Sequence, residues 1–420
     1  MGPMLGWPAR IQVKEALVML QLWSRRLAGI VLVACAGLLL LGIVTRVAAY
    51  QPDFRVYYQA ARAYGAGLNP YEPESPTLAA KGPVPHPFVY PVLVLVPFTF
   101  MPPFSDHDAY RLFLLAKCLI LVGLLLLWRK ILGPAHSIVF YAFCLLAFNG
   151  SLYLDFLTGN VSVFEQGALW LSFLFLVRGN LFLFCLLVLV GSSFKVTPLL
   201  FLLLLWSTED RRRHWYFLGS LACFAVVHGA AFLSDVRLFP AFLENLRRFE
   251  ESGIVNPSTA NLLGSLSALV AATTGYEVPA AVRRILFGGI VVSIVFVSRR
   301  AYMGARGLPH DERVWQTVFL ACFVYALVLP RFKDYSFILL LVPSFAVIRR
   351  ASPVAAQTGL VILSILSAHY GHFPVFRRFL DLLWDYYPLA LAYLFWGIQV
   401  RDLVIRPASK AILPERAFSP

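Results

Sequence analysis

Five ionisable side chains stand within or beside long apolar runs of this sequence. Asp53 directly follows the first apolar run, and Lys195 lies in SSFKVTPLLFLLLLW, three residues before a proline. Arg331, Lys333 and Asp334 occur together in VLPRFKDYSFILLLVP. A charge at membrane depth costs roughly 2.5–3.5 kcal/mol and usually faces a cavity or a partner. A carboxylate can serve as a general base, and cations can bind an anion such as phosphate. The simpler interpretation is that the charged side chains extend to the membrane surface or form an ion pair there.

The segment around Asp53 is predicted to be an amphipathic helix lying along a membrane interface. Its aromatic and apolar side chains recur at helical spacing: Phe54, Tyr57, Tyr58, Ala61 and Tyr64. Gly65 and Gly67 then end the helix. Two interpretations remain open here. Asp53 either caps the helix, with the tyrosines as an aromatic belt, or is a functional carboxylate.

Two further stretches carry polar residues or prolines at unusual places. LDFLTGNVSVFEQGALW sets Asp155, Asn160 and Glu165 around a turn at Gly159, and for Glu165 the turn alone explains the polarity. HPFVYPVLVLVPFTFMPP, residues 86–103, has an apolar core too short to span a bilayer and prolines that prevent a regular helix. We therefore expect a juxtamembrane or re-entrant element there.

The composition is that of a polytopic membrane protein. The chain has 420 residues, of which 59% are hydrophobic and 14% charged, and its mean hydropathy is +0.73. The formal net charge of +14 does not indicate nucleic-acid binding, because the basic residues occur as pairs and triplets at the ends of apolar runs. All six cysteines lie inside apolar runs without metal-site or disulfide spacing, so we expect neither.

The length of the apolar runs predicts twelve membrane spans. Two of them, 180–194 and 196–206, could instead form one long helix. The predicted spans are 27–49, 109–128, 138–156, 160–177, 180–194, 196–206, 215–234, 281–298, 314–330, 335–348, 355–370 and 386–400. The first is interpreted as an uncleaved signal anchor.

These spans divide the chain into a cytoplasmic segment 1–26, an integral-membrane catalytic domain 27–400 and a cytoplasmic tail 401–420. The first extracytoplasmic loop is 50–108. With the N-terminus inside, the cytoplasmic segments carry the excess of Lys and Arg, as the positive-inside rule requires. The unusual polar residues then gather at the outer face, which suggests a site that opens outward.

Other enzyme signatures are missing from the sequence. It contains no Walker loop, no GxGxxG after a strand, no HExxH and no local Ser/His/Asp signature.

Six stretches in order resemble one enzyme family. They are DFRVYYQAARAYGAGLNPY, FVYPVLVLVPF, TGNVSVFEQGALW, KVTPLLFLLLLW, NPSTANLLGSLSALV and PRFKDYSFILLLVP. Together they resemble the polyprenyl-phosphate-mannose-dependent transferases of the GT-C superfamily, above all glycosyltransferase family 87, which includes mannosyltransferases that extend phosphatidylinositol mannosides. The chain departs from the family at Lys333-Asp334-Tyr335-Ser336, where many members have Trp-Asp-His-Tyr.

The resemblance implies an all-α GT-C-like bundle of about twelve transmembrane helices with juxtamembrane helices in the first loop. It also implies an inverting transferase that moves a hexose, with mannose as the expected sugar, from polyprenyl phosphate to a lipid or glycan acceptor. Asp53 would be the base, and Lys195, Arg331 and Lys333 would bind the donor phosphate. Sugar-binding or supporting roles fall to a larger set: Arg55, Tyr57, Tyr58, Asp155, Asn160, Asp334 and Tyr335.

No metal or other cofactor is required by this chemistry, and the expected partners are the donor, the acceptor and membrane lipids. The expected location is the plasma or inner membrane, with the site on the extracytoplasmic side. Two alternatives remain. One is a polyprenyl-phosphate-arabinose donor, and the other is a lipid-linked-sugar transporter, which should line a path through both leaflets and show repeated halves.

Overall fold

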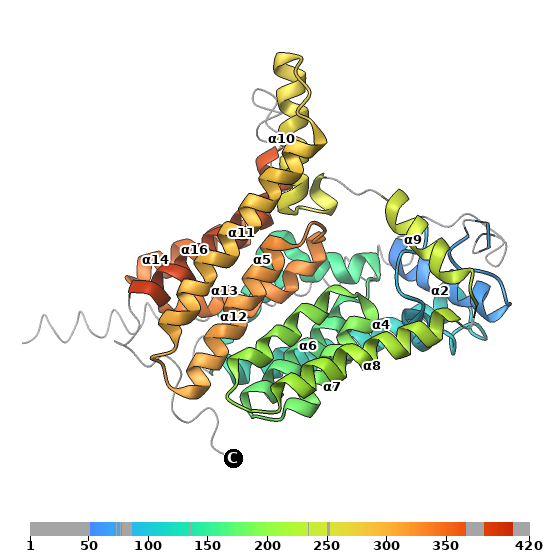
Figure 1. Ribbon diagram of the computed structural model, residues 1–420, viewed down its shortest axis with the longest axis horizontal. Helices are drawn as coiled ribbons and strands as arrows, with labels where there is room; N and C mark the ends of the chain where they lie inside the picture. Colours follow the sequence, from blue (N-terminus) through green and yellow to red (C-terminus); the bar gives the residue numbers. More distant parts are fainter. Residues whose placement is uncertain are drawn as a thin grey trace, which may run out of the picture.

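The chain is helical throughout the part that a computed structural model describes (Figure 1). The described residues are 51–72, 74–75, 77, 86–133, 137–233, 235–249, 253–366 and 382–405, and no strand occurs within them. The predicted signal anchor 27–49, the segment 1–26 and most of the tail 401–420 lie outside these ranges. The elements are α2 Pro52–Gly65, η1 Val92–Phe98, α4 Asp106–Leu132, α5 Ser137–Thr158, α6 Ser162–Val177, α7 Leu181–Phe194, η2 Thr197–Ser207, α8 Arg213–Leu233, α9 Leu238–Arg248, η3 Gly253–Val255, α10 Thr259–Thr274, α11 Ala280–Ala305, α12 His310–Val328, η4 Asp334–Leu340, α13 Leu341–Arg350, α14 Val354–Ile365 and α16 Tyr387–Ile405.

Five described helices are long and apolar enough to cross a membrane. They are α4, α5 from Ile138 onward, α8, α11 and α16, and four shorter apolar helices accompany them: α6, α7, η2 and α14. The protein is therefore an all-α polytopic membrane protein, as the sequence predicted. Every predicted span after the first overlaps a helix, although the total of twelve crossings stays a prediction.

Residues 180–206 form two elements. α7 ends at Phe194, and Lys195 has an extended backbone with φ −146° and ψ 139° before η2 begins. Pro198 lies in the first turn of η2, where a helix tolerates proline. Backbone N–H groups in the first turn have no partner within the helix, so the missing N–H of proline costs no hydrogen bond there. The break places the partly buried Lys195 side chain at a helix junction instead of within a continuous helix.

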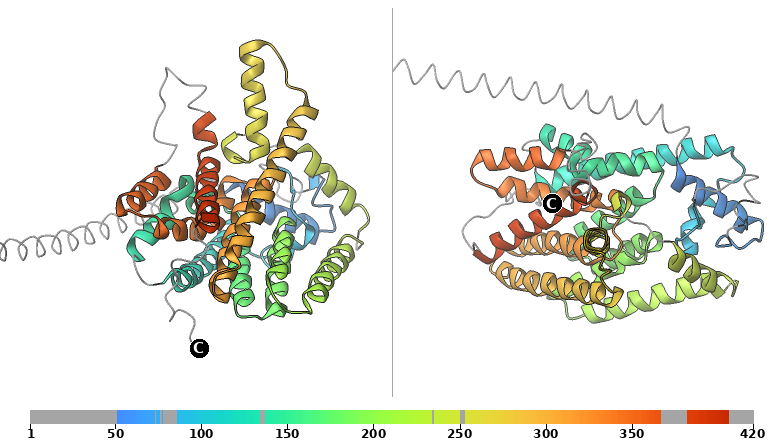
Figure 2. Two further views of the ribbon diagram at one scale, coloured as in Figure 1. Left: turned by 60° about the vertical axis from the view of Figure 1, so that its left-hand side comes forward. Right: turned by 90° about the horizontal axis from the view of Figure 1, so that it is seen from above.

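A main apolar core lies among the bundle helices, and a second one lies at the end of the bundle. The second core combines α2, η1, the start of α4 and part of α9, which gather at one end of the molecule (Figure 1, Figure 2). The expectation of a short element at residues 86–103 is confirmed by η1, whose seven residues cannot span a bilayer.

The aromatic belt, one of the two interpretations left open for α2, is not formed. Tyr57 is 0% and Tyr58 1% exposed, because η1 and α4 pack on the aromatic face of the helix. Of the three tyrosines, Tyr64 alone reaches the surface, at 36% exposure. Helical periodicity identified the apolar face of α2 correctly, but protein rather than lipid covers it.

Candidate active site

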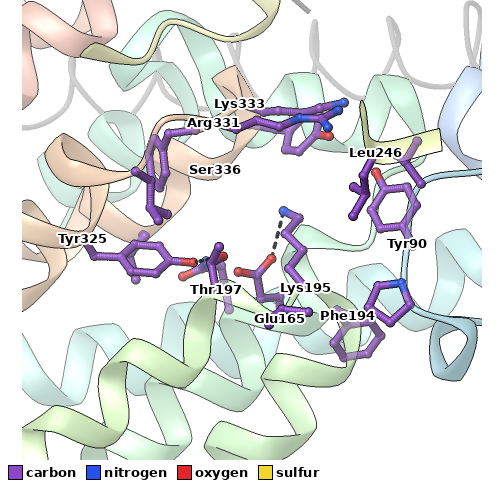
Figure 3. A pocket seen from close by; sticks show the side chains of 18 of the residues that line it. Tyr90, Glu165, Phe194, Lys195, Thr197, Leu246, Tyr325, Arg331, Lys333 and Ser336 are labelled. Atoms are coloured by element: carbon purple, nitrogen blue, oxygen red, sulfur yellow. Dashed lines mark hydrogen bonds and ion pairs between the residues drawn. The ribbon is translucent and has the colours of Figure 1, made fainter. Parts of the chain in front are cut away.

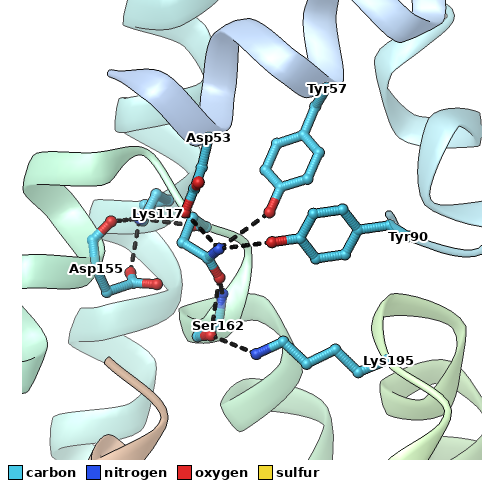
Figure 4. Close-up of polar contacts among 8 residues, drawn as sticks. Asp53, Tyr57, Tyr90, Lys117, Asp155, Ser162 and Lys195 are labelled. Atoms are coloured by element: carbon cyan, nitrogen blue, oxygen red, sulfur yellow. Dashed lines mark hydrogen bonds and ion pairs between the residues drawn. The ribbon is translucent and has the colours of Figure 1, made fainter. Parts of the chain in front are cut away.

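Asp53 lies in the first turn of α2 and is bound from two sides (Figure 4). Asn160 Nδ2 donates to Asp53 Oδ2 at 2.7 Å, and His86 Nε2 lies 3.1 Å from Oδ1. The N-cap of α2 is Gln51, and no side chain caps the helix. Asp53 is therefore not a helix cap, and its carboxylate is held by residues far away in the sequence.

The environment of Asp53 favours its ionised form. Burial by itself raises the pKa of this carboxyl, but the hydrogen bond from His86 and the charge of Lys333 act in the opposite direction. Together with the hydrogen bond from Asn160 they bring the pKa of Asp53 below its ordinary value. The group is thus a carboxylate at neutral pH and can accept a proton.

Asn160 is the centre of a buried polar cluster. Its Nδ2 lies 3.0 Å from the hydroxyl of Tyr57 and 3.1 Å from that of Tyr90, in addition to Asp53. Its Oδ1 accepts hydrogen bonds from the Ser162 backbone nitrogen at 3.0 Å and hydroxyl at 2.9 Å. Burial raises the pKa of Tyr57 well above its ordinary value, so this hydroxyl stays protonated. Such a fully engaged amide fixes the orientation of Asp53.

The turn that carries Asn160 is fixed by its backbone and by a buried lysine. Gly159 has φ +70°, and a Cβ there would lie 2.7 Å from Cβ of Phe54, so only glycine permits α2 to approach. Lys117 Nζ, from α4, lies 2.6 Å from Asp155 Oδ2 and donates to the carbonyl oxygens of Asp155 at 2.7 Å and of Asn160 at 2.8 Å. Asp155 is therefore a buried partner of Lys117, beneath the turn.

A cavity of about 260 Å³ lies beside this cluster (Figure 3). The three cations expected to bind phosphate, Lys195, Arg331 and Lys333, all line it. Arg331 and Lys333 face Lys195 across the open space in Figure 3. Tyr90 and Tyr335 also line the cavity, so the sugar-binding candidate Tyr335 belongs to its wall.

Glu165 is a functional candidate that the sequence interpretation assigned to the turn alone. It lines the cavity and forms a 2.9 Å ion pair with Lys195 Nζ, which also donates to Ser162 Oγ at 2.9 Å. Among the residues that the structure describes, three cations and one carboxylate line the cavity, so their summed charge is positive. Such a cavity suits an anionic group.

The remaining cations rest against aromatic rings. Arg331 Cζ lies 5.1 Å and Lys333 Nζ 5.8 Å from the ring centroid of Phe249, and Lys333 Nζ lies 5.5 Å from that of Tyr335. These contacts stabilise the two cations at the wall of the cavity. Asp334 accepts a hydrogen bond from the backbone nitrogen of Tyr335 at 2.8 Å and does not line the cavity.

A chain of hydrogen bonds connects the cavity with the carboxylate (Figure 4). It runs from Lys195 through the Ser162 hydroxyl and the Asn160 amide to Asp53. One cation of the predicted phosphate site is therefore connected with the predicted base through two polar side chains.

Two predicted site residues lie elsewhere. Arg55 is exposed, and the Tyr58 hydroxyl donates to the backbone oxygen of Phe104 at 2.8 Å. Both line a separate small cavity with Asp106 and His107. Asp53 and Tyr57 are four residues apart and share a helix face, whereas the backbone turns Arg55 and Tyr58 away from it.

Besides Glu165 and Ser162, three further contributors escaped the sequence interpretation. His86 and Tyr90 lie in the proline-rich stretch before η1. Their polar side chains beside prolines and apolar residues were the feature of the sequence that could have indicated a role in the site. Lys117 had a clear signal, since it is a lone charge in the predicted span 109–128. Among the described residues no group of three His, Cys, Asp or Glu side chains is arranged to hold a metal ion.

Comparison with known proteins identifies the family. The family model for glycosyltransferase family 87 matches residues 88–330, which is more than half of the chain and includes Asn160, Glu165 and Lys195. No curated protein and no solved structure matched the chain. The protein belongs to glycosyltransferase family 87 and is a membrane-embedded glycosyltransferase.

Proposed function

We propose that the protein transfers a hexose, mannose in our interpretation, from polyprenyl phosphate to a hydroxyl of an extracytoplasmic glycolipid or glycan. The observation that carries the proposal is the connection between an ionised, buried Asp53 and a cavity lined by three cations. A base and an anion-binding pocket at adjoining positions are what glycosyl transfer from a sugar phosphate requires.

In the proposed reaction, the phosphate of the donor binds Lys195, Arg331 and Lys333, and the sugar lies toward Tyr90. The acceptor hydroxyl gives its proton to the Asp53 carboxylate as its oxygen forms a bond to the anomeric carbon. The bond between that carbon and the phosphate oxygen breaks, and its electron pair leaves with the phosphate. Because the acceptor attacks from the face opposite the leaving group, the anomeric configuration inverts.

Several features favour a lipid monophosphate as the donor. The cavity is small and largely apolar or aromatic apart from its charged groups, and residues of the shorter apolar helices α6, α7 and η2 line it. Three cations match one phosphate, and Tyr90 of the cavity wall contacts the Asn160 amide that holds Asp53. The extracytoplasmic location follows from the distribution of Lys and Arg along the sequence.

The role of Glu165 in this reaction is to position Lys195. Its carboxylate holds the ammonium group at the cavity wall before the donor arrives. When the phosphate binds, Lys195 can share its three N–H groups among Glu165, Ser162 and the phosphate. Binding of the donor is thereby connected with the amide that orients Asp53.

A donor panel tests the proposal. Purified protein in lipid nanodiscs is incubated with labelled polyprenyl phosphates that carry mannose, glucose or arabinose, together with a membrane lipid extract. Labelled product is expected from the mannose donor and not from the Asp53→Asn variant, and its anomeric configuration should be inverted. Transfer from arabinose alone would reassign the sugar. Retention of configuration, or no transfer from any of the three donors, would overturn the mechanism.

A further inference from the structure

Phe249, the residue directly after α9, contacts both parts of the candidate site. Its ring centroid lies 5.5 Å from that of His86, with the two ring planes inclined by 32°. The same His86 ring binds Oδ1 of Asp53 at 3.1 Å through Nε2. On its other contacts, the Phe249 ring lies 5.1 Å from Arg331 Cζ and 5.8 Å from Lys333 Nζ. One aromatic ring therefore touches the imidazole that holds the proposed base and two of the cations that line the cavity.

The position of Phe249 is fixed by hydrogen bonds at the end of α9. Its backbone N–H donates to the Asn245 carbonyl at 3.0 Å. The side chain of Asn245 is 7% exposed, and its Nδ2 donates to the carbonyl oxygens of Tyr71 at 2.7 Å and of Phe88 at 3.0 Å. Phe88 follows His86 by two residues. The end of α9 is thus bound to the backbone of the same stretch whose imidazole the Phe249 ring contacts.

An aromatic ring can hold cations without competing for them. The face of a phenyl ring attracts a guanidinium or ammonium group but carries no charge that would neutralise it. A carboxylate in the place of Phe249 would instead pair with Arg331 and Lys333 and compete with a phosphate. Lys195, on the opposite wall, does have a carboxylate partner in Glu165. The two sides of the cavity therefore hold their cations by different means, and the Phe249 side keeps the full positive charge of both groups.

We propose that Phe249 is a positioning residue, whose ring keeps His86 directed at Asp53 and keeps Arg331 and Lys333 at the cavity wall. Phe249 itself does not line the cavity, so it acts through these neighbours and not on the substrate. The proposal rests on the proposed function, in which Asp53 is the base and the cations bind the donor phosphate. It adds a single side chain that sets the geometry of both.

Three variants separate the ring from the bulk of the side chain. Phe249→Leu removes the ring and retains an apolar side chain, whereas Phe249→Tyr keeps the ring. Phe296→Leu is the matched control, because Arg300 Cζ lies 4.7 Å from the Phe296 ring on α11, which takes no part in the candidate site. This control removes the same kind of ring-to-cation contact at another place in the protein.

The kinetic test looks for two defects in one variant. Phe249→Leu should raise KM for the donor about threefold or more, as expected for the loss of cation–π contacts. It should also lower kcat about threefold or more, because His86 no longer holds the Asp53 carboxylate in place. KM for the acceptor should not change. Phe249→Tyr and Phe296→Leu should match the wild type in all three constants.

A double-variant comparison shows whether the two defects have separate routes. In the His86→Phe background, Phe249→Leu should lower kcat no further, since the imidazole through which the ring acts is absent. It should still raise KM for the donor by the full factor, since Arg331 and Lys333 remain. A further loss of kcat equal to that in the wild-type background would contradict the route through His86.

Two other outcomes would overturn the proposal. One is an unchanged donor KM and kcat in Phe249→Leu. The other is an equal loss in Phe249→Leu and Phe249→Tyr, accompanied in both by a lower Tm in detergent, which would assign Phe249 to packing alone.

A binding measurement separates this proposal from the proposed transfer reaction. Native mass spectrometry records how much sugar-free polyprenyl phosphate is retained by the wild type, Phe249→Leu, Phe249→Tyr and Phe296→Leu. Reduced retention in Phe249→Leu alone supports the action of the ring on the cations even if the wild type transfers no sugar from the panel, in which case only the proposed function fails. Equal retention in all four proteins would contradict the proposal whatever the transfer assays show.

Discussion

The side-chain amide of Asn160 donates a 2.7 Å hydrogen bond to the carboxylate of Asp53, from which it is separated by 107 residues of sequence. The bond connects the first turn of α2 with the turn between α5 and α6. The same amide accepts from Ser162, whose hydroxyl also binds Lys195. This one contact therefore joins the proposed base to the proposed phosphate site, and the predictions below follow from it and its neighbours.

Asp53→Asn should reduce the transfer rate by about 10²–10⁴ while leaving folding and donor binding largely intact. Asparagine keeps the shape and can still accept from Asn160, but it cannot take a proton from the acceptor. Single-turnover assays and donor retention by native mass spectrometry measure the two properties. Asp106→Asn is the control, because that carboxylate is 62% exposed at the start of α4. A wild-type rate in Asp53→Asn would move the base to another carboxylate, with Glu165 as the first to test.

Replacing Lys195, Arg331 or Lys333 with Ala should raise KM for the donor by about tenfold or more in each case, since hydrogen bonds to charged groups contribute roughly 1.5–3 kcal/mol. Loss of Lys195 also leaves the Glu165 carboxylate without its ion-pair partner. The double variant Lys195→Met/Glu165→Gln, which removes both charges, is therefore measured beside it. Arg55→Ala, which changes an exposed arginine, should behave as the wild type. Unchanged donor kinetics in all three variants would show that these cations do not bind the phosphate.

Lys117→Met should destabilise the protein by about 3–5 kcal/mol, because it leaves the buried Asp155 carboxylate without its cation. Adding Asp155→Asn removes the isolated charge and should recover much of the thermal stability. The double variant should still have a lower kcat than the wild type, since the carbonyl of Asn160 has lost its bond to Lys117. Thermal unfolding in detergent and kcat together test this. Full recovery of both would mean that Lys117 serves stability and not the orientation of Asn160.

The dependence of activity on pH should change when His86 is removed. Burial raises the pKa of Asp53 and the His86 hydrogen bond lowers it, with a net result below the ordinary value of 3.8. A carboxyl whose pKa is lowered by folding stabilises the protein above the unfolded pKa, and this contribution is lost as the pH falls through the folded value. In the wild type Asp53 should therefore stay ionised between pH 5 and 8.

In His86→Phe, burial should dominate and the pKa of Asp53 should rise. The acid side of the kcat/KM profile should consequently move to higher pH. His107→Phe is the control, because His107 lines the separate small cavity near Arg55. If the acid sides of the kcat/KM profiles of His86→Phe and the wild type coincide, His86 is not the group that keeps Asp53 ionised.

The sequence by itself determined the membrane class and most helix positions. Apolar length predicted spans such as 109–128 and 138–156, and prolines predicted that residues 86–103 would form a short element. These features are local, because the bilayer requires about 20 apolar residues and each proline breaks the hydrogen bonding of its own segment. Rare charges in apolar surroundings also made Asp53 and Lys195 candidates, because a charge in such surroundings is costly unless it has a partner.

Tertiary structure decided which side chains meet. The sequence placed Arg55, Tyr57 and Tyr58 together near Asp53, but only Tyr57 faces the buried cluster. It did not indicate that Lys117 pairs with Asp155 or that Glu165 holds Lys195. These contacts join residues that are more than 25 positions apart, and they depend on how helices pack, with Gly159 allowing α2 to approach the turn. Helical periodicity fixes the face on which a residue lies, and only the packing of several helices determines what that face contacts.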